Sequence, residues 1–245
     1  MGSVVGDSCV VDLAVAKTEK YASRESGDTV ELIERPSGGF SIVMIDGQGS
    51  GRAAKTLSLM LSSKAVALVK EGVRDGVVAR ATHDYLFAFR HGQVSATLDL
   101  LSVDLKTPSI VVTRNAEAPM LLRDAEGIRA IGTESGPIGR YRWTKPSVME
   151  LPLQEGVRLV LFTDGIPHSG RKQSVPPFDF DELAARVLTE DRPAQEIADH
   201  VLEEALLRDR HHPGDDMAVV VLSLRAPQAG TGPVIRRIHA EIPLV

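Results

Sequence analysis

The chain has 245 residues, of which 43% are hydrophobic and 25% charged, so it can bury a full core and is not dominated by disorder. Its formal net charge of -5 at pH 7 argues against a nucleic-acid-binding protein, which normally carries a basic excess. Cys9 is the single cysteine, which excludes an internal disulfide and fits a reducing compartment. We see no signal peptide and no apolar run of about 18 residues, and therefore expect a cytoplasmic protein without a membrane span.

Hydrophobic periodicity divides the chain into short strands and four helices. A hairpin is expected over residues 28–46, and two helices follow it directly. The predicted strands are 8–18, 28–34, 41–46, 94–103, 109–113, 119–123, 128–131, 147–151, 157–163 and 217–224. The predicted helices are 51–71, 76–90, 180–188 and 193–207.

The order of these elements lacks the regular strand–helix alternation of a parallel sheet. Many strands in hairpins favour an antiparallel α+β architecture, with two sheets and the helices outside them. Residues 132–146 and 165–178 are expected to be irregular. We predict one domain over residues 1–225, then a linker that begins at residue 226 and a possible edge strand over 235–245 that packs on the same domain.

The chain is organised around residues 41–51, an apolar strand that ends in an acidic, glycine-rich turn before a long helix. Gly47, Gly49 and Gly51 occupy every second position, so the backbone there can take positive φ or approach a bound group closely. Asp46 is therefore held at the end of a sheet, beside free amides and a helix N-terminus. Such a place suits a metal ion, a phosphate, or both.

The same design, an apolar strand beside an aspartate, occurs at three further places, which are marked by Asp28, Asp164 and the pair Asp215-Asp216. Carboxylates that converge at strand ends repel each other unless a cation holds them, and Mg²⁺ or Mn²⁺ prefers such oxygen ligands. Two such ions would suit hydrolysis of a phosphate ester. An Asp-Gly pair is also an ordinary turn, so a purely structural role stays open for each position.

Several motifs then occur in the order found in the metal-dependent Ser/Thr protein phosphatases of type 2C. They are Asp46-Gly47-x-Gly49-x-Gly51, Leu161-Phe162-Thr163-Asp164-Gly165 and Gly214-Asp215-Asp216-Met217, with supporting matches at Ser26-Gly27-Asp28, Thr97-Leu98-Asp99, Val103-Asp104, Asn115 to Pro119 and Gly136-Pro137-Ile138-Gly139. The chain most resembles the bacterial branch named after stage II sporulation protein E. Within that branch it is similar to the small feedback phosphatases of stress-sigma-factor signalling, from about Asp28 to Leu224.

The resemblance implies an αββα sandwich of two antiparallel sheets between helix pairs, with two Mn²⁺ or Mg²⁺ ions at one edge. Carried over by motif, Asp46 would bridge both metals and the Gly47 carbonyl would bind the second. Asp164 and Asp215 would bind the first metal. Asp28 would be an outer ligand through water, and Asp216 would support the site from behind. A metal-activated water would then attack phosphorus without a phospho-enzyme.

Two departures from the wider superfamily affect this picture. Gln48 stands where many type 2C enzymes have a histidine, and an amide cannot do acid–base work, although the bacterial branch often lacks this histidine too. Arg24 and Arg52 are candidate phosphate clamps by position only, and a solvated surface charge is the alternative for both.

Other polar and aromatic residues are expected to lie outside the chemistry. The histidines His168, His211 and His212 are interpreted as loop residues, although His168 could reach a substrate. The pair Arg171-Lys172 is interpreted as a solvated loop that could dock a protein. Tyr141 with Trp143 is interpreted as packing for the loop 132–146, with binding of a partner as the weaker alternative.

The leading hypothesis is a protein phosphatase that acts on phosphoserine or phosphothreonine of a bacterial regulatory protein in stress signalling. By family analogy the substrate and partner would be a phosphorylated STAS-domain protein, an anti-sigma antagonist or a stressosome component. One alternative is a pseudo-phosphatase that binds a phosphoprotein without turnover. Another is a hydrolase of small phosphate esters.

Overall fold

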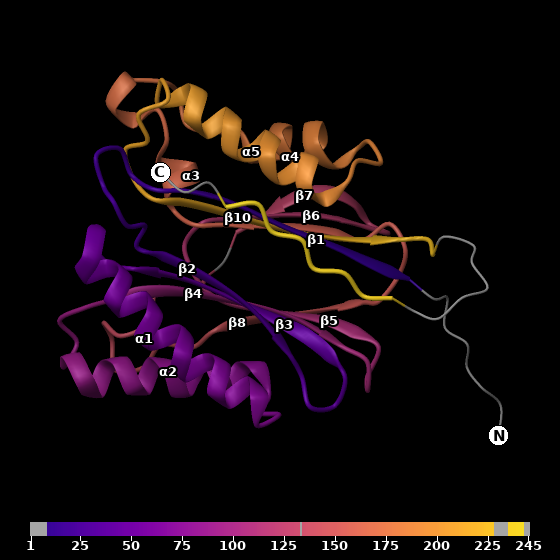
Figure 1. The fold of residues 1–245 in the computed structure, drawn as a ribbon, viewed down its shortest axis with the longest axis horizontal. Helices are drawn as coiled ribbons and strands as arrows, with labels where there is room; N and C mark the ends of the chain where they lie inside the picture. The colour runs from indigo at the N-terminus through magenta and orange to yellow at the C-terminus, as the bar shows by residue number, and fades with distance from the viewer. Residues whose placement is uncertain (1–8, 133, 228–234, 243–245) are drawn as a thin grey trace.

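The computed structural model describes residues 9–132, 134–227 and 235–242. Two antiparallel five-stranded sheets lie face to face, and each carries helices on its outer face (Figure 1). This is the predicted αββα sandwich, and the described strands and helices run from Val10 to Arg225. No helix in these described ranges is long and apolar enough to cross a bilayer.

The first sheet has the strand order β1-β10-β9-β6-β7, so the last strand of the chain lies beside the first. Its strands are β1 (Val10–Thr18), β6 (Met120–Asp124), β7 (Gly127–Ile131), β9 (Arg158–Phe162) and β10 (Met217–Arg225). The helices α4 (Phe180–Leu188) and α5 (Ala194–Arg208) cover its outer face. Every residue of β9 is buried, which explains why the strand is apolar at every position after Arg158 in place of an alternating pattern.

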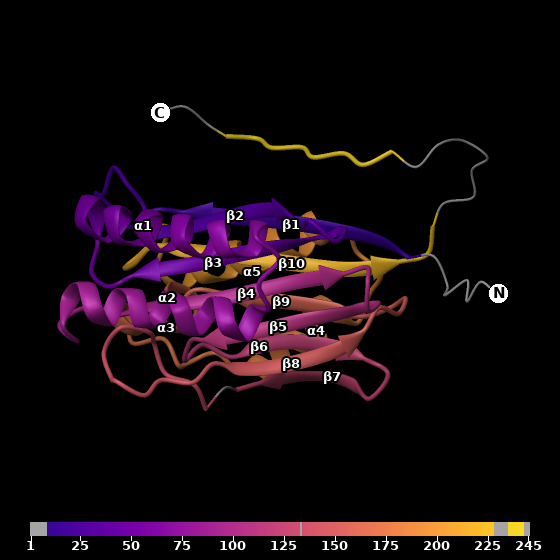
Figure 2. The same cartoon turned by 90° about the horizontal axis from the view of Figure 1, so that it is seen from below.

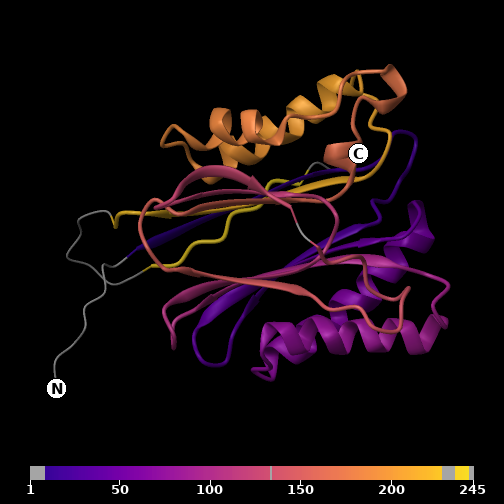
Figure 3. The same ribbon diagram turned by 180° about the vertical axis from the view of Figure 1, so that it is seen from behind.

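The second sheet has the order β2-β3-β4-β5-β8 and places the predicted hairpin at one side. Its strands are β2 (Asp28–Glu34), β3 (Gly39–Gly47), β4 (Ala96–Asp104), β5 (Ser109–Asn115) and β8 (Ser147–Pro152). The helices α1 (Gly51–Lys70) and α2 (Asp75–Arg90) lie against it, as Figure 2 shows from below. The same layers are seen from behind in Figure 3.

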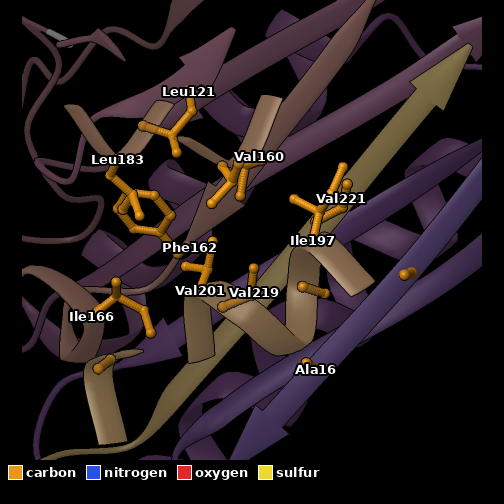
Figure 4. Packing of buried hydrophobic residues seen from close by; sticks show 14 of the residues in the cluster. Ala16, Leu121, Val160, Phe162, Ile166, Leu183, Ile197, Val201, Val219 and Val221 are labelled. Carbon is orange, nitrogen blue, oxygen red and sulfur yellow. The ribbon is translucent and has the colours of Figure 1, made fainter. Parts of the chain in front are cut away.

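Three apolar clusters hold the layers together. One lies between the two sheets, one between the second sheet and α1 with α2, and one between the first sheet and α4 with α5. In the last cluster, Phe162 of β9 lies beside Leu183 of α4 and Val201 of α5 (Figure 4). Phe162 directly precedes Thr163 and Asp164, so this packing fixes the strand end that carries the third acidic motif.

Two sequence predictions differ from the structure. The segment 165–178 is not wholly irregular, since it contains α3 (Gly165–His168) and a 3-10 helix (Arg171–Gln173). The predicted edge strand over 235–245 is wrong for residues 235–242, which form no strand, and residues 243–245 lie outside the described ranges. Ile235, Ile238 and Ile242 are three and four residues apart, not in the alternation of a strand, and Ile238 is 84% exposed, so no apolar surface favours pairing here.

Candidate metal and phosphate site

The acidic motifs meet at one end of the sandwich, where strands of both sheets terminate. Asp28 begins β2 and lies directly opposite Asp46 near the end of β3. Asp164 follows β9, and Asp215 lies two residues before β10 in the other sheet. The Thr163 hydroxyl donates to Asp28 Oδ2 at 2.8 Å and so links the two sheets at this point.

A pocket of about 430 Å³ opens at this end of the molecule. Asp46, Asp164 and Asp215 all line it, which confirms that the fold gathers these three distant carboxylates. Residues 116–119 and Pro137 also line it. Because these residues are mostly apolar, the pocket combines apolar surface with a few polar groups, as ligand sites commonly do.

The carboxylates perturb each other strongly. Burial, followed by the negative charges of Asp28, Asp164 and Asp215, raises the pKa of Asp46 to about 10. Burial raises the pKa of Asp28 to about 7, although the Thr163 hydrogen bond acts in the opposite direction. Burial and the charge of Asp215 also raise the pKa of Asp164. Without a cation, the site therefore holds protons at neutral pH.

Asp28 is the most enclosed of these acids, because its side chain is completely buried. Its Oδ1 atom has no hydrogen-bond partner among the residues that the structure describes, which is costly for a buried carboxylate oxygen. Its main-chain carbonyl accepts from Lys17 Nζ at 2.5 Å and from Lys55 Nζ at 2.9 Å. These two lysines bring positive charge behind the acidic floor, and no sequence motif pointed to them.

The donor set fits a hard divalent cation in kind, because it consists of carboxylates, one with a buried and unpartnered oxygen. No group of three or more His, Cys, Asp or Glu side chains in the described part of the chain is already arranged to hold an ion. The charges of Asp164 and Asp215 add to burial in raising the pKa of Asp46, so a cation would relieve repulsion among these carboxylates.

Asp216 lies behind the pocket and not in its lining. Its Oδ1 accepts from the Lys20 amide at 2.9 Å, and its Oδ2 accepts from the Gly27 amide at 2.8 Å. It therefore fastens the loop between β1 and β2 and sets the position of Asp28. This geometry agrees with the supporting role expected for Asp216.

The glycines that follow two of the acids are required by close backbone contacts. A Cβ atom on Gly47 would lie 2.5 Å from the Ala54 carbonyl oxygen of α1. A Cβ atom on Gly165 would lie 2.0 Å from the Asp216 carbonyl oxygen. Both distances are far below van der Waals contact, so the Asp-Gly pairs here serve packing as well as turning. The Gly47 carbonyl as a metal ligand stays a prediction.

Two residues that the sequence analysis set aside lie in the pocket. His168 and Arg171 line it, and His168 Nδ1 is 3.6 Å from Asp164 Oδ2. Arg24 and Arg52 are exposed and do not line it. The signal that could have identified Arg171 was its short distance in sequence from Asp164, because a single-turn helix leaves it near the strand end.

Gln48 also lines the pocket, but its amide oxygen is engaged. Gln48 Oε1 accepts from the Ser95 amide at 2.8 Å and from the Ser95 hydroxyl at 3.2 Å. The side chain therefore joins the end of β3 to the start of β4. Gln48 therefore holds these two strand ends in position and does not act as an acid.

Thr163 is expected to contribute more to stability than its size suggests. It donates to Asp28 and its Oγ1 also accepts from the Ala218 amide at 2.9 Å. We predict that Thr163→Val lowers the free energy of unfolding by about 2–4 kcal/mol, since it leaves two buried polar groups unpaired. Urea unfolding measures this loss.

Thr113→Val is the matched control, because the hydroxyl of Thr113 is buried in the other sheet and has no hydrogen-bond partner. Its replacement is expected to be neutral or stabilising. Equal destabilisation by the two variants would contradict the role assigned to the Thr163 hydroxyl.

Comparison with known proteins agrees with this geometry. The family model for stage II sporulation protein E matches residues 36–225. Two curated relatives carry that description: the protein of Priestia megaterium is 23% identical over 216 residues, and that of Bacillus subtilis (strain 168) is 22% identical over 214. The matches cover 88% and 87% of this chain but only 37% and 26% of the relatives, so the chain spans well under half their length.

Solved structures of similar shape include three phosphatase-related proteins. The type 2C phosphatase domain of SpoIIE from Bacillus subtilis, with a fragment of its regulatory domain, gives a TM-score of 0.76 at 23% identity, covering 90% of this chain and 65% of that one. The RsbU and RsbW domains of a Mycobacterium tuberculosis protein give 0.73 at 21%, covering 89% and 61%. RsbX in complex with magnesium gives 0.66 at 16%, covering 87% and 95%. At these identities the structures show that the fold is shared.

Proposed function

Because the chain belongs to the family of stage II sporulation protein E, we propose that it is a metal-dependent phosphatase that hydrolyses phosphoserine or phosphothreonine in a regulatory protein. The observation that carries this proposal is the convergence of Asp46, Asp164 and Asp215 in one pocket. Carboxylates gathered in one cleft, with the pKa values of Asp46 and Asp164 raised by burial and by neighbouring charges, are a recognised sign of a functional site.

In this proposal the acidic floor holds two Mn²⁺ or Mg²⁺ ions. Asp46 would bridge them, Asp164 and Asp215 would hold one, and the Gly47 carbonyl would hold the other. Asp28 would act as an outer ligand. When bound, such ions lower the pKa of a water molecule and neutralise phosphate oxygens. Asp216, Thr163 and the two lysines behind Asp28 keep the carboxylates in place.

The rest of the pocket suits the phosphorylated side chain. Arg171 lines the pocket and would bring positive charge toward a phosphate dianion. The wall at residues 116–119 would pack against the methylene of serine or the methyl of threonine. Because Gln48 cannot donate a proton as an acid, the leaving oxygen would take its proton from water.

The regulatory partner is proposed from the solved structures that share this fold. Structures of similar shape include the RsbU and RsbW domains and one from work on the bacterial stressosome. We therefore propose a STAS-domain phosphoprotein as the substrate, in a stress-response pathway of the cytoplasm. This substrate rests on analogy, whereas the chemistry rests on the pocket.

The proposal is tested by phosphate release from a phosphoserine peptide, with Mn²⁺ and with a chelator. We expect hydrolysis only with the metal, and little from a phosphotyrosine peptide. Calorimetric binding of Mn²⁺ without turnover would instead support the pseudo-phosphatase. Faster hydrolysis of free phosphate monoesters than of the peptide would support the small-ester hydrolase. Hydrolysis that persists in chelator would overturn the metal mechanism.

A further inference from the structure

The segment between β7 and β8 presents two large aromatic side chains to solvent. Trp143 is 73% exposed and Tyr141 is 65% exposed. Trp143 is also the single tryptophan of the chain. Packing of the loop by these two residues, expected from the sequence, is therefore wrong, because their rings face outward. Exposed tryptophan and tyrosine are enriched at the centres of protein interfaces.

The exposure is imposed by a well-anchored backbone. The Gly139 amide donates to His83 Nδ1 at 3.1 Å, and Ile138 exchanges two main-chain hydrogen bonds with Ala96. On the far side, the Lys145 carbonyl accepts from the Ser135 hydroxyl at 2.5 Å and from Asn115 Nδ2 of β5 at 3.4 Å. The aromatic residues are thus held at both ends of a short segment, so binding there costs little conformational entropy.

Arginines surround the exposed rings. The guanidinium of Arg142 lies 5.3 Å from the Trp143 ring centroid, and that of Arg80 on α2 lies 6.0 Å from it. Arg140 lies 5.9 Å from the Tyr141 ring. Asp84 is the acid paired with Arg80, at 3.5 Å. The surface formed by Arg80, Arg140, Tyr141, Arg142 and Trp143, here called the arginine–tryptophan surface, is therefore basic on a chain of net charge -5.

This surface is continuous with the pocket. Pro137 lines the pocket and stands three residues before Arg140, and Ala96, which pairs with Ile138, lines it as well. Three residues of extended chain span about 10 Å. A peptide whose phosphorylated side chain enters the pocket can therefore place residues a few positions away against the exposed rings.

We propose that the arginine–tryptophan surface docks an acidic segment of the phosphoprotein substrate, a few residues from the phosphorylated serine or threonine. This inference rests on the proposed function and specifies its substrate class. Charge complementarity favours an acidic peptide, and arginine with tryptophan supplies both ion pairing and stacking. A single-stranded nucleic acid would use the same side chains, and tighter binding of such a strand is the outcome of the test that would reassign this surface.

The test uses the fluorescence of Trp143, which reports docking without turnover. The full chain, in chelator, is titrated with two phosphoserine peptides of equal length, one flanked by Asp and Glu and one by Lys, and with a thymidine oligonucleotide. We expect the acidic peptide to bind about 10-fold more tightly than the basic one, since two or three exposed ion pairs differ between them. Arg140→Ala with Arg142→Ala should remove this preference.

Hydrolysis then gives the second readout. With Mn²⁺, the double variant should lose about 10-fold in kcat/KM on the acidic peptide and keep its rate on p-nitrophenyl phosphate. Phe89→Ala is the matched control, because Phe89 is also exposed and lies 4.8 Å from the guanidinium of Arg90, a neighbouring residue of α2. It should change neither readout.

The outcomes separate the two proposals. Docking that depends on Arg140 and Arg142, in a protein that hydrolyses no peptide, would keep the docking surface and overturn the phosphatase. Hydrolysis with no preference for acidic flanks, or with equal rates in the double variant, would overturn the docking surface alone. Tighter binding of the oligonucleotide than of the acidic peptide would assign the surface to nucleic acid and refute our proposal.

Discussion

Asp46→Asn is expected to abolish metal-dependent phosphate release, by at least about 10³-fold, while the fold persists. Asp46 lies between the other acids of the pocket, and an asparagine there keeps the shape but removes the charge that two cations would share. The measurement is kcat/KM on a phosphoserine peptide in Mn²⁺. Asp104→Asn, at the opposite end of the same sheet, is the control and should keep full activity.

The same variant is expected to stabilise the metal-free protein. The pKa of Asp46 is raised to about 10, so its contribution to stability is fully present below pH 4 and falls as pH rises toward 10. Asparagine does not titrate. The variant should therefore exceed the wild type in Tm by a margin that grows from pH 5 to pH 8 in chelator, reaching several degrees, because about 1 kcal/mol shifts Tm by about 2–4 °C at this size.

Addition of Mn²⁺ should reverse the order of the two Tm values, so that the wild type becomes the more stable protein. It should raise the Tm of the wild type, because the ion replaces the protons that the acids hold, and leave the Asp46→Asn variant nearly unchanged. If the difference in Tm between the variant and the wild type shrinks as pH rises, or if Mn²⁺ stabilises both proteins equally, Asp46 does not lie at the centre of the charge cluster. More than about 1% residual activity would remove Asp46 from the metal site.

The fold could be predicted from the sequence because its strands and helices carry clear periodic patterns and its acids follow strand ends. Asp46, Asp164 and Asp215 are separated by long stretches of chain, yet each lies beside an apolar strand, and the pairing of β9 with β10 brings the last two together. Periodicity predicts where a strand ends. It does not predict which sheet the strand joins, and the order β1-β10-β9-β6-β7 came from the structure.

The residues that sequence reasoning missed contact the site from elements that are distant from it in the sequence. Lys17 and Lys55 reach the Asp28 carbonyl from β1 and α1, and neither stands in a motif. Arg171 enters the pocket because α3 is a single helical turn, which the proline-rich composition of the segment concealed. The strand predicted over the tail was wrong for 235–242, because the isoleucines there are three and four residues apart and stay exposed, with no surface to pair with.

Breaking the buried ion pair between Asp99 and Arg114 is expected to give the largest loss of stability in the molecule. These residues lie opposite each other on β4 and β5, both about 3% exposed, with Arg114 Nε 2.8 Å from Asp99 Oδ1. Asp99→Ala leaves a buried guanidinium unpaired, which costs about 3–5 kcal/mol and should lower Tm by roughly 10 °C. Thermal and urea unfolding measure this loss.

A compensating double variant distinguishes the effect of this ion pair on protein stability from its effect on the position of the pocket wall. Asp99→Leu with Arg114→Met replaces the pair by apolar groups of similar volume, and should recover most of the lost stability, since the surrounding layer between the sheets is apolar. Arg114 Nη2 also donates to the Ala118 carbonyl at 2.8 Å, and Ala118 lines the pocket. The recovered double variant should therefore still show a raised KM for a phosphopeptide, because the pocket wall has lost its anchor. Wild-type KM in a stable double variant would contradict this role and leave the ion pair with a structural role alone.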